Sequence, residues 1–254
     1  MLKRVFVSIA PVVVLLLGGA PLRAQGKPNP HPIFTYVSDW GVPRAQWSDM
    51  AKDNAEDKAV LDPLVADGTL LGYGLYENRI HSDGGYTHGS WFQASSLANL
   101  FKALEMLYTR ASVTAPVLGA SKHQDFLMVS HDYGAKAVSN STGYIRVIGA
   151  EVKPEHVNDF LEAYRRTLVP VYEKLLADGT IVFYQLDSEY NIENAPGRIF
   201  SVVGTRDAEG LDKVRAAIED LVEKNPAALS GLISNTVPNS RIDLLGRITT
   251  MTHK

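Results

Sequence analysis

VLDPLVADGTLLGYGL, at residues 60–75, is repeated as VYEKLLADGTIVFYQL at residues 171–186. Eight of the sixteen aligned positions are identical, and the offset between the two stretches is 111 residues throughout. A constant offset over this length indicates a duplicated structural unit rather than a chance match of a short motif.

Both stretches predict the same local structure, a helix that turns sharply into a strand. Leu64 and Leu175 lie on the apolar faces of the predicted helices. Gly68 and Gly179 follow at the positions where helices commonly end in a left-handed residue. Beyond each glycine the apolar residues alternate, as they do in a strand. The repeat therefore predicts two copies of one helix-to-strand unit.

The N-terminal residues have the pattern of an export signal. Two basic residues precede an apolar run over residues 5–19, which is too short to span a membrane, and residues 22–24 (LRA) supply a small residue before a cleavage site. We expect a secretory signal peptide over residues 1–24, cleaved after Ala24, and a periplasmic or secreted protein without a stable membrane span. The alternative is an uncleaved anchor.

Composition narrows the classes of function. The formal net charge is −3, and loss of residues 1–24 removes three basic residues and no acidic one, which leaves −6. Because no basic stripe is present, we expect no nucleic-acid partner. The sequence has no cysteine, which excludes disulfides, thiolate metal sites and thiol catalysis. We expect a monomer or a weak homodimer.

The predicted elements follow one another in the same order in both halves. The first repeat, residues 33–133, reads as strands at 33–39, 69–78, 86–93 and 125–133, with helices at 43–67 and from Ser95 or Ser96. The second repeat, residues 144–254, reads as strands at 144–152, 180–187, 198–204 and from Ile242, with helices at 154–178 and from Asp207. An extended lead-in at 25–32 and a linker at 134–143 complete the division, and Pro63 predicts a kink or break in the first helix.

This order predicts an α+β protein made of two ferredoxin-like repeats. The strands are apolar on both sides and the helices can cover one face only, so we expect the two antiparallel sheets to pack together as an α+β barrel within one chain. The doubled unit resembles the dimeric α+β barrel superfamily, specifically its fused single-chain members, over nearly all of residues 33–254. That superfamily contains antibiotic-biosynthesis-type monooxygenases, haem-binding proteins and chlorite-dismutase-like enzymes, and its members share a fold without signature residues.

The resemblance raises the question of a cofactor. In chlorite-dismutase-like proteins a helix histidine of the second half ligates haem. The second half of this sequence has no histidine deep in a helix, since His156 lies in the first turn of one. We therefore expect no cofactor, and no metal site either, because no HxH or HExxH pair occurs.

The first helices of the two repeats differ on their apolar faces. The second repeat presents large side chains such as Tyr164 and Leu168 where the first has Asp53 and Asp57. Unpaired carboxylates are costly to bury, so this face is either exposed or paired. The charged run over residues 53–58 favours an exposed face. The alternative is that the two aspartates meet histidines and help to bind a ligand.

Histidines of the first repeat are the candidates for acid–base chemistry. His88 lies in the middle of a predicted strand, where the second repeat has Ile199, and His131 lies in another strand. We identify His88 and His131 as candidate catalytic residues. The alternative is that each is an ordinary surface or core histidine.

Aromatic residues and two glycines predict a ligand pocket in the first repeat. All three tryptophans lie there, and Trp91 and Tyr73 accompany a strand in which Gly72 and Gly74 carry no side chain. The second repeat has a phenylalanine and a glutamine at the two glycine positions. Space beside aromatic side chains suits a flat organic ligand, although ordinary core packing also explains any single tryptophan.

These observations support three functions. The first is an exported protein that binds a small, partly aromatic molecule in the first repeat, with Trp91, Tyr73, Gly72, Gly74, Asp53 and Asp57 around the ligand. The second is a cofactor-independent monooxygenase or isomerase in which His88 or His131 acts as the base. The third is a non-catalytic structural or protein-interaction module.

Overall fold

The strands of this protein form one closed barrel. The computed structural model describes residues 32–81, 84–190 and 197–254. Within these ranges eight antiparallel strands follow one another around the barrel in the order β1-β3-β2-β8-β5-β7-β6-β4. Their bounds are β1 Phe34–Gly41, β2 Gly72–Asn78, β3 His88–Ala94, β4 Lys122–Ala135, β5 Val138–Glu151, β6 Ile181–Glu189, β7 Arg198–Thr205 and β8 Ile242–His253.

The two halves of the chain contribute four neighbouring strands each. The first half gives the order β4-β1-β3-β2 and the second gives the equivalent order β8-β5-β7-β6. Hydrogen-bonded pairing of β2 with β8 and of β4 with β6 joins them on both sides. The predicted α+β class and the barrel within one chain are therefore confirmed. Closure also leaves no unpaired sheet edge in the barrel.

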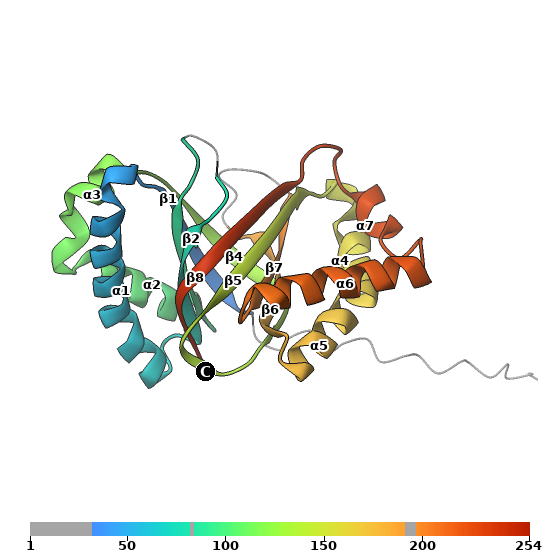
Figure 1. Cartoon of the computed structure of the whole chain (residues 1–254), viewed down its shortest axis with the longest axis horizontal. Coiled ribbons are helices and arrows are strands. Elements are labelled where there is room, and N and C mark those ends of the chain that lie inside the picture. The colour runs from blue at the N-terminus through green and yellow to red at the C-terminus, as the bar shows by residue number, and fades with distance from the viewer. Residues whose placement is uncertain (1–31, 82–83, 191–196) are drawn as a thin grey trace, which may run out of the picture.

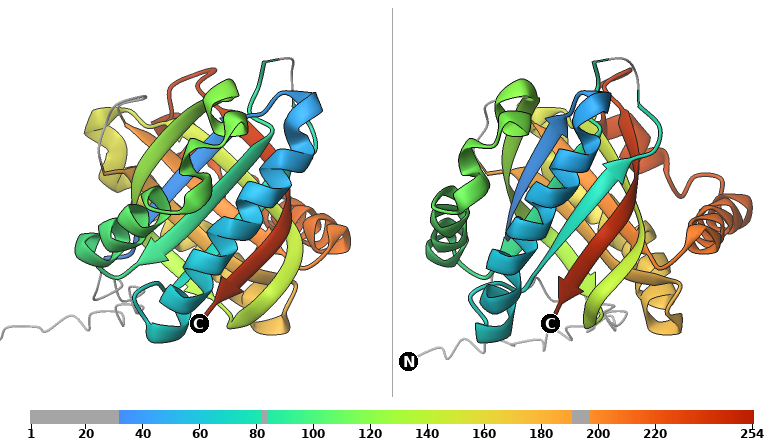
Figure 2. Two further views of the ribbon diagram at one scale, coloured as in Figure 1. Left: turned by 90° about the vertical axis from the view of Figure 1, so that its left-hand side faces the viewer. Right: turned by 60° about the vertical axis from the view of Figure 1, so that its left-hand side comes forward.

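Helices cover the barrel from two opposite sides (Figure 1). Those of the first half are η1 Arg44–Gln46, α1 Trp47–Asp67, α2 Leu97–Tyr108, η2 Ala111–Thr114 and α3 Pro116–Ala120. Those of the second half are η3 Pro154–His156, α4 Val157–Thr167, α5 Val169–Asp178, α6 Ala208–Lys224 and α7 Ser230–Asn235. The turned views show α1, α2 and α3 in front of the first-half strands, with α6 on the far side of the barrel (Figure 2).

The repeated stretch forms the predicted glycine turn in both halves. Gly68 and Gly179 end their helices with φ of 84° and 85°, values that suit glycine because it has no Cβ. The preceding aspartate closes each turn by accepting a hydrogen bond from a backbone amide. Asp67 accepts from Thr69 at 2.8 Å, and the second copy repeats this contact at 2.9 Å.

The helix that is divided is the long helix of the second half, not that of the first half. α1 continues through Pro63 to Asp67, so of the kink or break predicted at this proline the break does not occur. The second-half helix is instead divided at Leu168 into α4 and α5. Pro170 stands in the first turn of α5, where a missing amide hydrogen breaks no helical hydrogen bond.

The polar stretch at 134–143 belongs mostly to strands. β4 runs to Ala135 and β5 begins at Val138, so residues 136–137 alone separate them. Small polar residues serve here as strand residues because β8 pairs with the start of β5. The expected signal peptide lies outside the described residues. Within those residues, no helix has the length and apolar character required to cross a membrane.

Among the described residues, buried apolar side chains form three large clusters and a small fourth one around Val42, Met50 and Val117. One cluster lies between α1, α2 and the first-half sheet and includes Leu61, Tyr73 and Phe92. A second lies between the second-half helices and their sheet. The third fills much of the barrel interior and includes Trp91 and Phe183. The molecule thus has two helix–sheet layers, one on either side of a barrel core.

Candidate functional site

A cavity of about 980 Å³ lies in the helix–sheet layer of the second half. The outer faces of β5, β6, β7 and β8 form one wall, and α4, α5, α6 and residues 229–236 form the other. Cavities that hold small organic molecules measure roughly 300–1,000 Å³, so this one is at the upper end of that range. Its walls are mainly apolar, with Phe160, Leu186 and Ile199 among the side chains that face it.

The contacts at the start of α6 help to explain the cavity between this helix and the sheet. Asp207 caps this helix by accepting a hydrogen bond from the amide of Gly210 at 2.8 Å. A Cβ on Gly210 would lie 2.8 Å from Cβ of Thr205, so the glycine permits close contact with the end of β7. Val214 is the last fully buried residue of α6. The remainder of the helix therefore covers the cavity without filling it.

Two hydroxyl groups give the cavity wall a polar point. The Tyr164 hydroxyl and Oγ of Ser201 are 2.7 Å apart and share a hydrogen bond. Tyr172 lies next to them, with its ring centroid 6.2 Å from that of Tyr164. Burial raises the pKa of Tyr164 well above its usual value, so the phenol stays neutral and retains its proton. These groups can donate or accept hydrogen bonds with an uncharged ligand.

Charged side chains at the cavity rim are paired with one another. Nη2 of Arg146 is 2.9 Å from Oδ2 of Asp243, which also lies 2.8 Å from Nη2 of Arg241. Arg215 pairs with Glu219 at 2.8 Å along α6. The lining residues with formal charges are three arginines and three carboxylates, counting Asp212. The rim therefore carries no net formal charge.

The residues of this cavity do not fit a haem or metal ligand set. Among the described residues that line it, none is histidine, cysteine or methionine, the usual axial ligands of haem together with tyrosine. Two tyrosines line the cavity, Tyr164 and Tyr172, and burial raises the pKa of both, which disfavours the phenolate that would ligate iron. Over the described ranges, no group of three or more histidine, aspartate and glutamate side chains is arranged to hold a metal ion.

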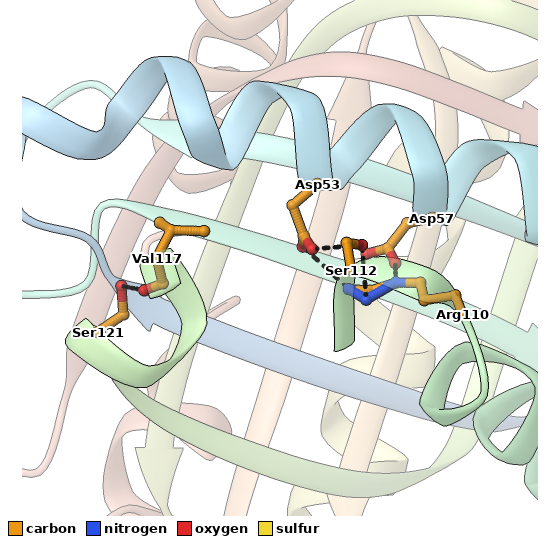
Figure 3. A network of polar contacts seen from close by, with 6 residues as sticks. All are labelled: Asp53, Asp57, Arg110, Ser112, Val117 and Ser121. Atoms are coloured by element: carbon orange, nitrogen blue, oxygen red, sulfur yellow. Dashed lines mark hydrogen bonds and ion pairs between the residues drawn. The ribbon is translucent and has the colours of Figure 1, made fainter. Parts of the chain in front are cut away.

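The corresponding layer of the first half contains a polar network (Figure 3). Asp53, at the position of Tyr164, is only 3% exposed. Arg110 donates from Nη2 to Oδ2 of Asp53 at 2.9 Å and from Nε to Oδ1 of Asp57 at 2.6 Å. Ser112 adds a hydrogen bond of 3.0 Å to Asp53. Burial raises the pKa of Asp57 to about 7, although the Arg110 guanidinium opposes this shift.

This network corrects two expectations about the aspartates. Asp53 is buried, so the exposed face predicted from the charged run is wrong at this position. Its partner is Arg110, from the segment after α2, and not a histidine. The aspartates thus have a cation that neutralises them within the protein. Sequence periodicity did not indicate this contact, because Arg110 lies 57 residues away in a connection without a repeated pattern.

The candidate histidines lie apart and line neither this cavity nor the barrel cavity described below. His88 is buried on β3, bonded through Nδ1 to Oγ1 of Thr87 at 3.0 Å and in edge contact with the Trp47 ring. Nε2 of His131, on β4, lies 2.9 Å from Oγ of Ser188. β1 separates β3 from β4 in the barrel. Burial lowers the pKa of both histidines, so both are neutral at pH 7.

The glycines predicted to leave space are already packed against rings. A Cβ on Gly74 would lie 2.1 Å from the Trp91 ring, and one on Gly72 would lie 2.6 Å from the ring of His253. The space expected at these two glycines is therefore filled. Tyr73 faces the helices instead, and its hydroxyl donates to Oδ1 of Asp62 at 2.5 Å. Of the predicted ligand residues, Trp91 alone lines one of the two cavities, and it faces the barrel interior.

The second-half cavity was not predicted from the sequence. An apolar helix face with large side chains such as Tyr164 and Leu168 is equally consistent with a filled core. Weak signals of the cavity are the small residues Ser201 and Ala208, which face it from β7 and the start of α6. Small residues at such positions do not distinguish a cavity from close packing, because that depends on how far the helix lies from the sheet.

Comparison with known proteins identifies the fold. No family model and no curated protein sequence matches this chain. A proposed monooxygenase from Lactobacillus acidophilus has a similar structure, with a TM-score of 0.63 and 13% identity over 88% of this chain and 96% of that one. For an anthrone oxidase-like protein, the TM-score is 0.56 and the sequence identity is 10%, over 89% of this chain and 94% of that one. For a chlorite dismutase variant from Candidatus Nitrospira defluvii, the TM-score is 0.52 and the sequence identity is 14%, over 85% of this chain and 91% of that one.

These similarities at low identity concern architecture alone. The structures are related over most of their length, whereas 10–14% identity does not establish a shared activity. The chain has the fold of the dimeric α+β barrel superfamily, with the whole barrel built from a single polypeptide.

Proposed function

We propose that the protein binds an uncharged, largely apolar small molecule with an aromatic ring system in the second-half cavity. The observation that carries this proposal is an apolar space of about 980 Å³ whose polar groups are the hydroxyls of Tyr164, Ser201, Tyr172 and Thr236 and the paired charges of the rim. A fully charged ligand would lose hydration on entry without meeting an unpaired opposite charge. A ring system with one phenol or carbonyl oxygen would gain a hydrogen bond at Tyr164 or Ser201.

A pair of aligned serines provides a matched test. Ser201 lines the cavity, and Ser90 occupies the position 111 residues earlier, on β3 of the first half. With N-phenyl-1-naphthylamine as a fluorescent probe, we expect Ser201→Phe to fill the cavity and weaken binding by at least about tenfold, or 1.4 kcal/mol. Ser90→Phe should leave the probe affinity unchanged. Both variants are first compared with the wild type by circular dichroism and thermal unfolding.

The outcome separates this cavity from other sites. Equal probe affinity in wild type and Ser201→Phe would contradict the proposal, as would equal weakening by both substitutions. Tyr164→Phe tests separately whether the hydroxyl groups of Tyr164 and Ser201 bind the ligand. This variant should bind 1-naphthol more weakly by about threefold to tenfold and bind naphthalene as well as the wild type does, because a net hydrogen bond contributes about 0.5–1.5 kcal/mol.

A second candidate function is cofactor-independent oxidation of a ligand in the same cavity. It is favoured by the similarity to proteins described as a monooxygenase and as anthrone oxidase-like. In such a reaction a ring methylene becomes a carbonyl, one oxygen atom of O₂ enters the product and the other leaves as water. Tyr164 and Ser201 would hold the substrate oxygen. The two candidate histidines lie outside the cavity and would not act directly.

Oxygen consumption with anthrone as substrate tests this reaction. We expect Tyr164→Phe to lower kcat/KM by about tenfold or more, while the combined His88→Ala and His131→Ala variant retains activity. Loss of activity in the histidine variant with Tyr164→Phe unaffected would return the reaction to the first half. No oxygen uptake by the wild type would leave ligand binding as the function.

Two further properties belong to the same proposal. We infer that the chain arose by duplication of one ferredoxin-like unit, since the strand order and the glycine turns are equivalent in both halves.

We also propose that the protein is exported after cleavage at Ala24, because residues 1–24 have the composition of a signal peptide. N-terminal sequencing of the mature protein beginning at Gln25 would support export, and an intact Met1 would contradict it.

A further inference from the structure

The barrel encloses a second cavity that the proposed function does not use. Its volume is about 300 Å³, and inward-facing residues of both halves line it. Five aromatic side chains form much of its wall: Tyr76, Trp91, Phe126, Phe183 and Phe200. The Trp91 and Phe183 rings meet with centroids 5.7 Å apart, and Phe126 meets Phe200 at 6.0 Å. The rings come from both halves of the chain and surround one small space.

Two buried carboxyl groups face the same space. Asp39 is 9% exposed and Asp187 is 2% exposed. Their hydrogen-bond donors are neutral: the Tyr76 hydroxyl lies 2.5 Å from Oδ1 of Asp39, and Oγ of Ser130 lies 2.6 Å from Oδ1 of Asp187. Burial raises the pKa of each aspartate to about 6. Neither carboxylate has a cationic side chain bonded to it among the described residues.

One cationic side chain lines this cavity within the described residues. It is Arg198, which donates from Nη2 to Oε1 of Glu151 at 3.2 Å and so already has an acidic partner. Buried carboxylates are normally neutralised by a partner of opposite charge. In the first-half helix layer Arg110 supplies that partner, whereas nothing equivalent reaches Asp39. Over the described part of the chain, the barrel cavity thus has two buried aspartates, an aromatic wall and no cation bonded to either aspartate.

We propose that the barrel cavity binds a small aromatic amine whose ammonium group pairs with Asp39 and whose ring lies among the aromatic side chains. Asp39 is favoured over Asp187 because both oxygens of Asp187 already accept hydrogen bonds, from Ser130 and Gln185. Aromatic faces attract a cation and also pack against a flat ring. The volume matches the lower end of the range for small-molecule sites, which suits one ring with a short side chain.

Gly89 supports the Asp39–Tyr76 pair at this site. A Cβ at this position would lie 2.7 Å from Oδ1 of Asp39 and 2.4 Å from the Tyr76 hydroxyl oxygen. The glycine therefore gives the two polar side chains room to meet. The aligned position 111 residues later holds Phe200, so the second half places a ring where the first half leaves this opening.

Three matched ligands test the charge requirement in calorimetric titrations at pH 7.5. Phenethylamine, 2-phenylethanol and phenylacetate share one ring and one chain length but differ in charge. We expect phenethylamine to bind at least about tenfold more tightly than the alcohol, and the anion to bind least. Equal affinity for amine and alcohol, or the absence of amine binding, would overturn the proposal.

Substitutions then place the ammonium group. Asp39→Asn should remove the preference for the amine over the alcohol, while Asp212→Asn, at the rim of the second-half cavity and outside the barrel cavity, should keep it. An unchanged preference in Asp39→Asn would also overturn the proposal. Ser201→Phe fills the other cavity and should leave amine binding intact, which separates this site from the proposed function.

The pH dependence of the wild type gives a result that needs no variant. The titratable groups near Asp39 are Tyr76, Tyr86 and Asp125, and Asp187, Arg198 and Asp243 line the same cavity. The amine stays protonated between pH 5 and 8, so protonation of Asp39 dominates. Phenethylamine affinity should fall by up to about tenfold per pH unit below about pH 6. Constant affinity down to pH 4.5 would contradict pairing with Asp39.

Discussion

The two helix–sheet layers of this protein are built on one plan and are filled differently. In the first half, α1 places Asp53 and Asp57 toward the sheet, and Arg110 fills the remaining space and neutralises them. In the second half Tyr164 occupies the position of Asp53, and a cavity of about 980 Å³ lies beneath α6. The two layers thus share one order of elements, but paired charges fill the first and a cavity lies in the second.

In the barrel interior each half contributes one buried aspartate, Asp39 from β1 and Asp187 from β6. The second half places Asp187 where the first half has Tyr76, and both face the same cavity. The halves also differ in which strand carries the glycine of a glycine–aromatic pair. Gly74 of β2 pairs with Trp91 of β3, whereas Phe183 of β6 pairs with Gly204 of β7. Small residues thus oppose large ones in both halves, but on different strands. The comparison of halves therefore predicts different consequences for equivalent substitutions.

Replacing Arg110 by methionine should have the largest effect. It leaves two carboxyl groups in the first layer without a cation, and breaking a buried ion pair in this way costs about 3–5 kcal/mol. We expect the free energy of unfolding, measured with urea at pH 8, to fall by about 4 kcal/mol. Arg165→Met removes the partner of Asp132 in the second half, where the arginine is 35% exposed, and should cost at most about 1 kcal/mol. Similar losses of unfolding free energy in the two variants would mean that the arginine is no more important in the first layer than in the second.

Asp187 should produce an intermediate effect that depends on pH. Burial raises its folded-state pKa to about 6, above the value of about 3.9 in an unfolded chain. The folded protein binds this proton more tightly, so the contribution is fully present below about pH 4 and is lost as pH rises through about 6. Relative to wild type, Asp187→Asn should therefore gain on the order of 2–3 kcal/mol between pH 4 and pH 7.5.

The Asp187 measurement has an internal control. Asp39 and Asp57 have pKa values shifted in the same direction but are present in both proteins, so their contributions cancel in the difference. Urea unfolding at several pH values gives the two stability curves. Parallel curves would show that Asp187 titrates normally.

The smallest expected effect concerns the interior glycines. A Cβ at Gly74 would meet the Trp91 ring at 2.1 Å, and one at Gly204 would meet Phe183 at the same distance. Gly74→Ala and Gly204→Ala should each lower stability by about 1–3 kcal/mol through overpacking. Gly119 has open space around it and serves as the control, since its alanine variant should be neutral or slightly stabilising. A neutral Gly74→Ala would imply that the Trp91 ring can move aside.

Predictions of elements from the sequence were more accurate than predictions of contacts. The strands and the long helices were located within a few residues, because their signals are local periodicity and glycine turns. The position of the helix break was wrong, since Pro63 is accommodated within α1 while the chain divides before Pro170. The candidate site was placed in the first half because aspartates and glycines there interrupt an apolar pattern. Those interruptions are explained by Arg110 and by Trp91.

The sequence by itself determined the α+β class and the order of elements, because these depend on residues close together in the chain. Only the tertiary structure decided which side chains meet. Arg110 reaches Asp53 across 57 residues, and Trp91 fills the space beside a glycine of the neighbouring strand. The second-half cavity lies beneath α6, whose buried residues, Gly210 and Val214, both stand in its first two turns. The spacing of this helix from the sheet follows from the packing of whole elements, which no local pattern in the sequence specifies.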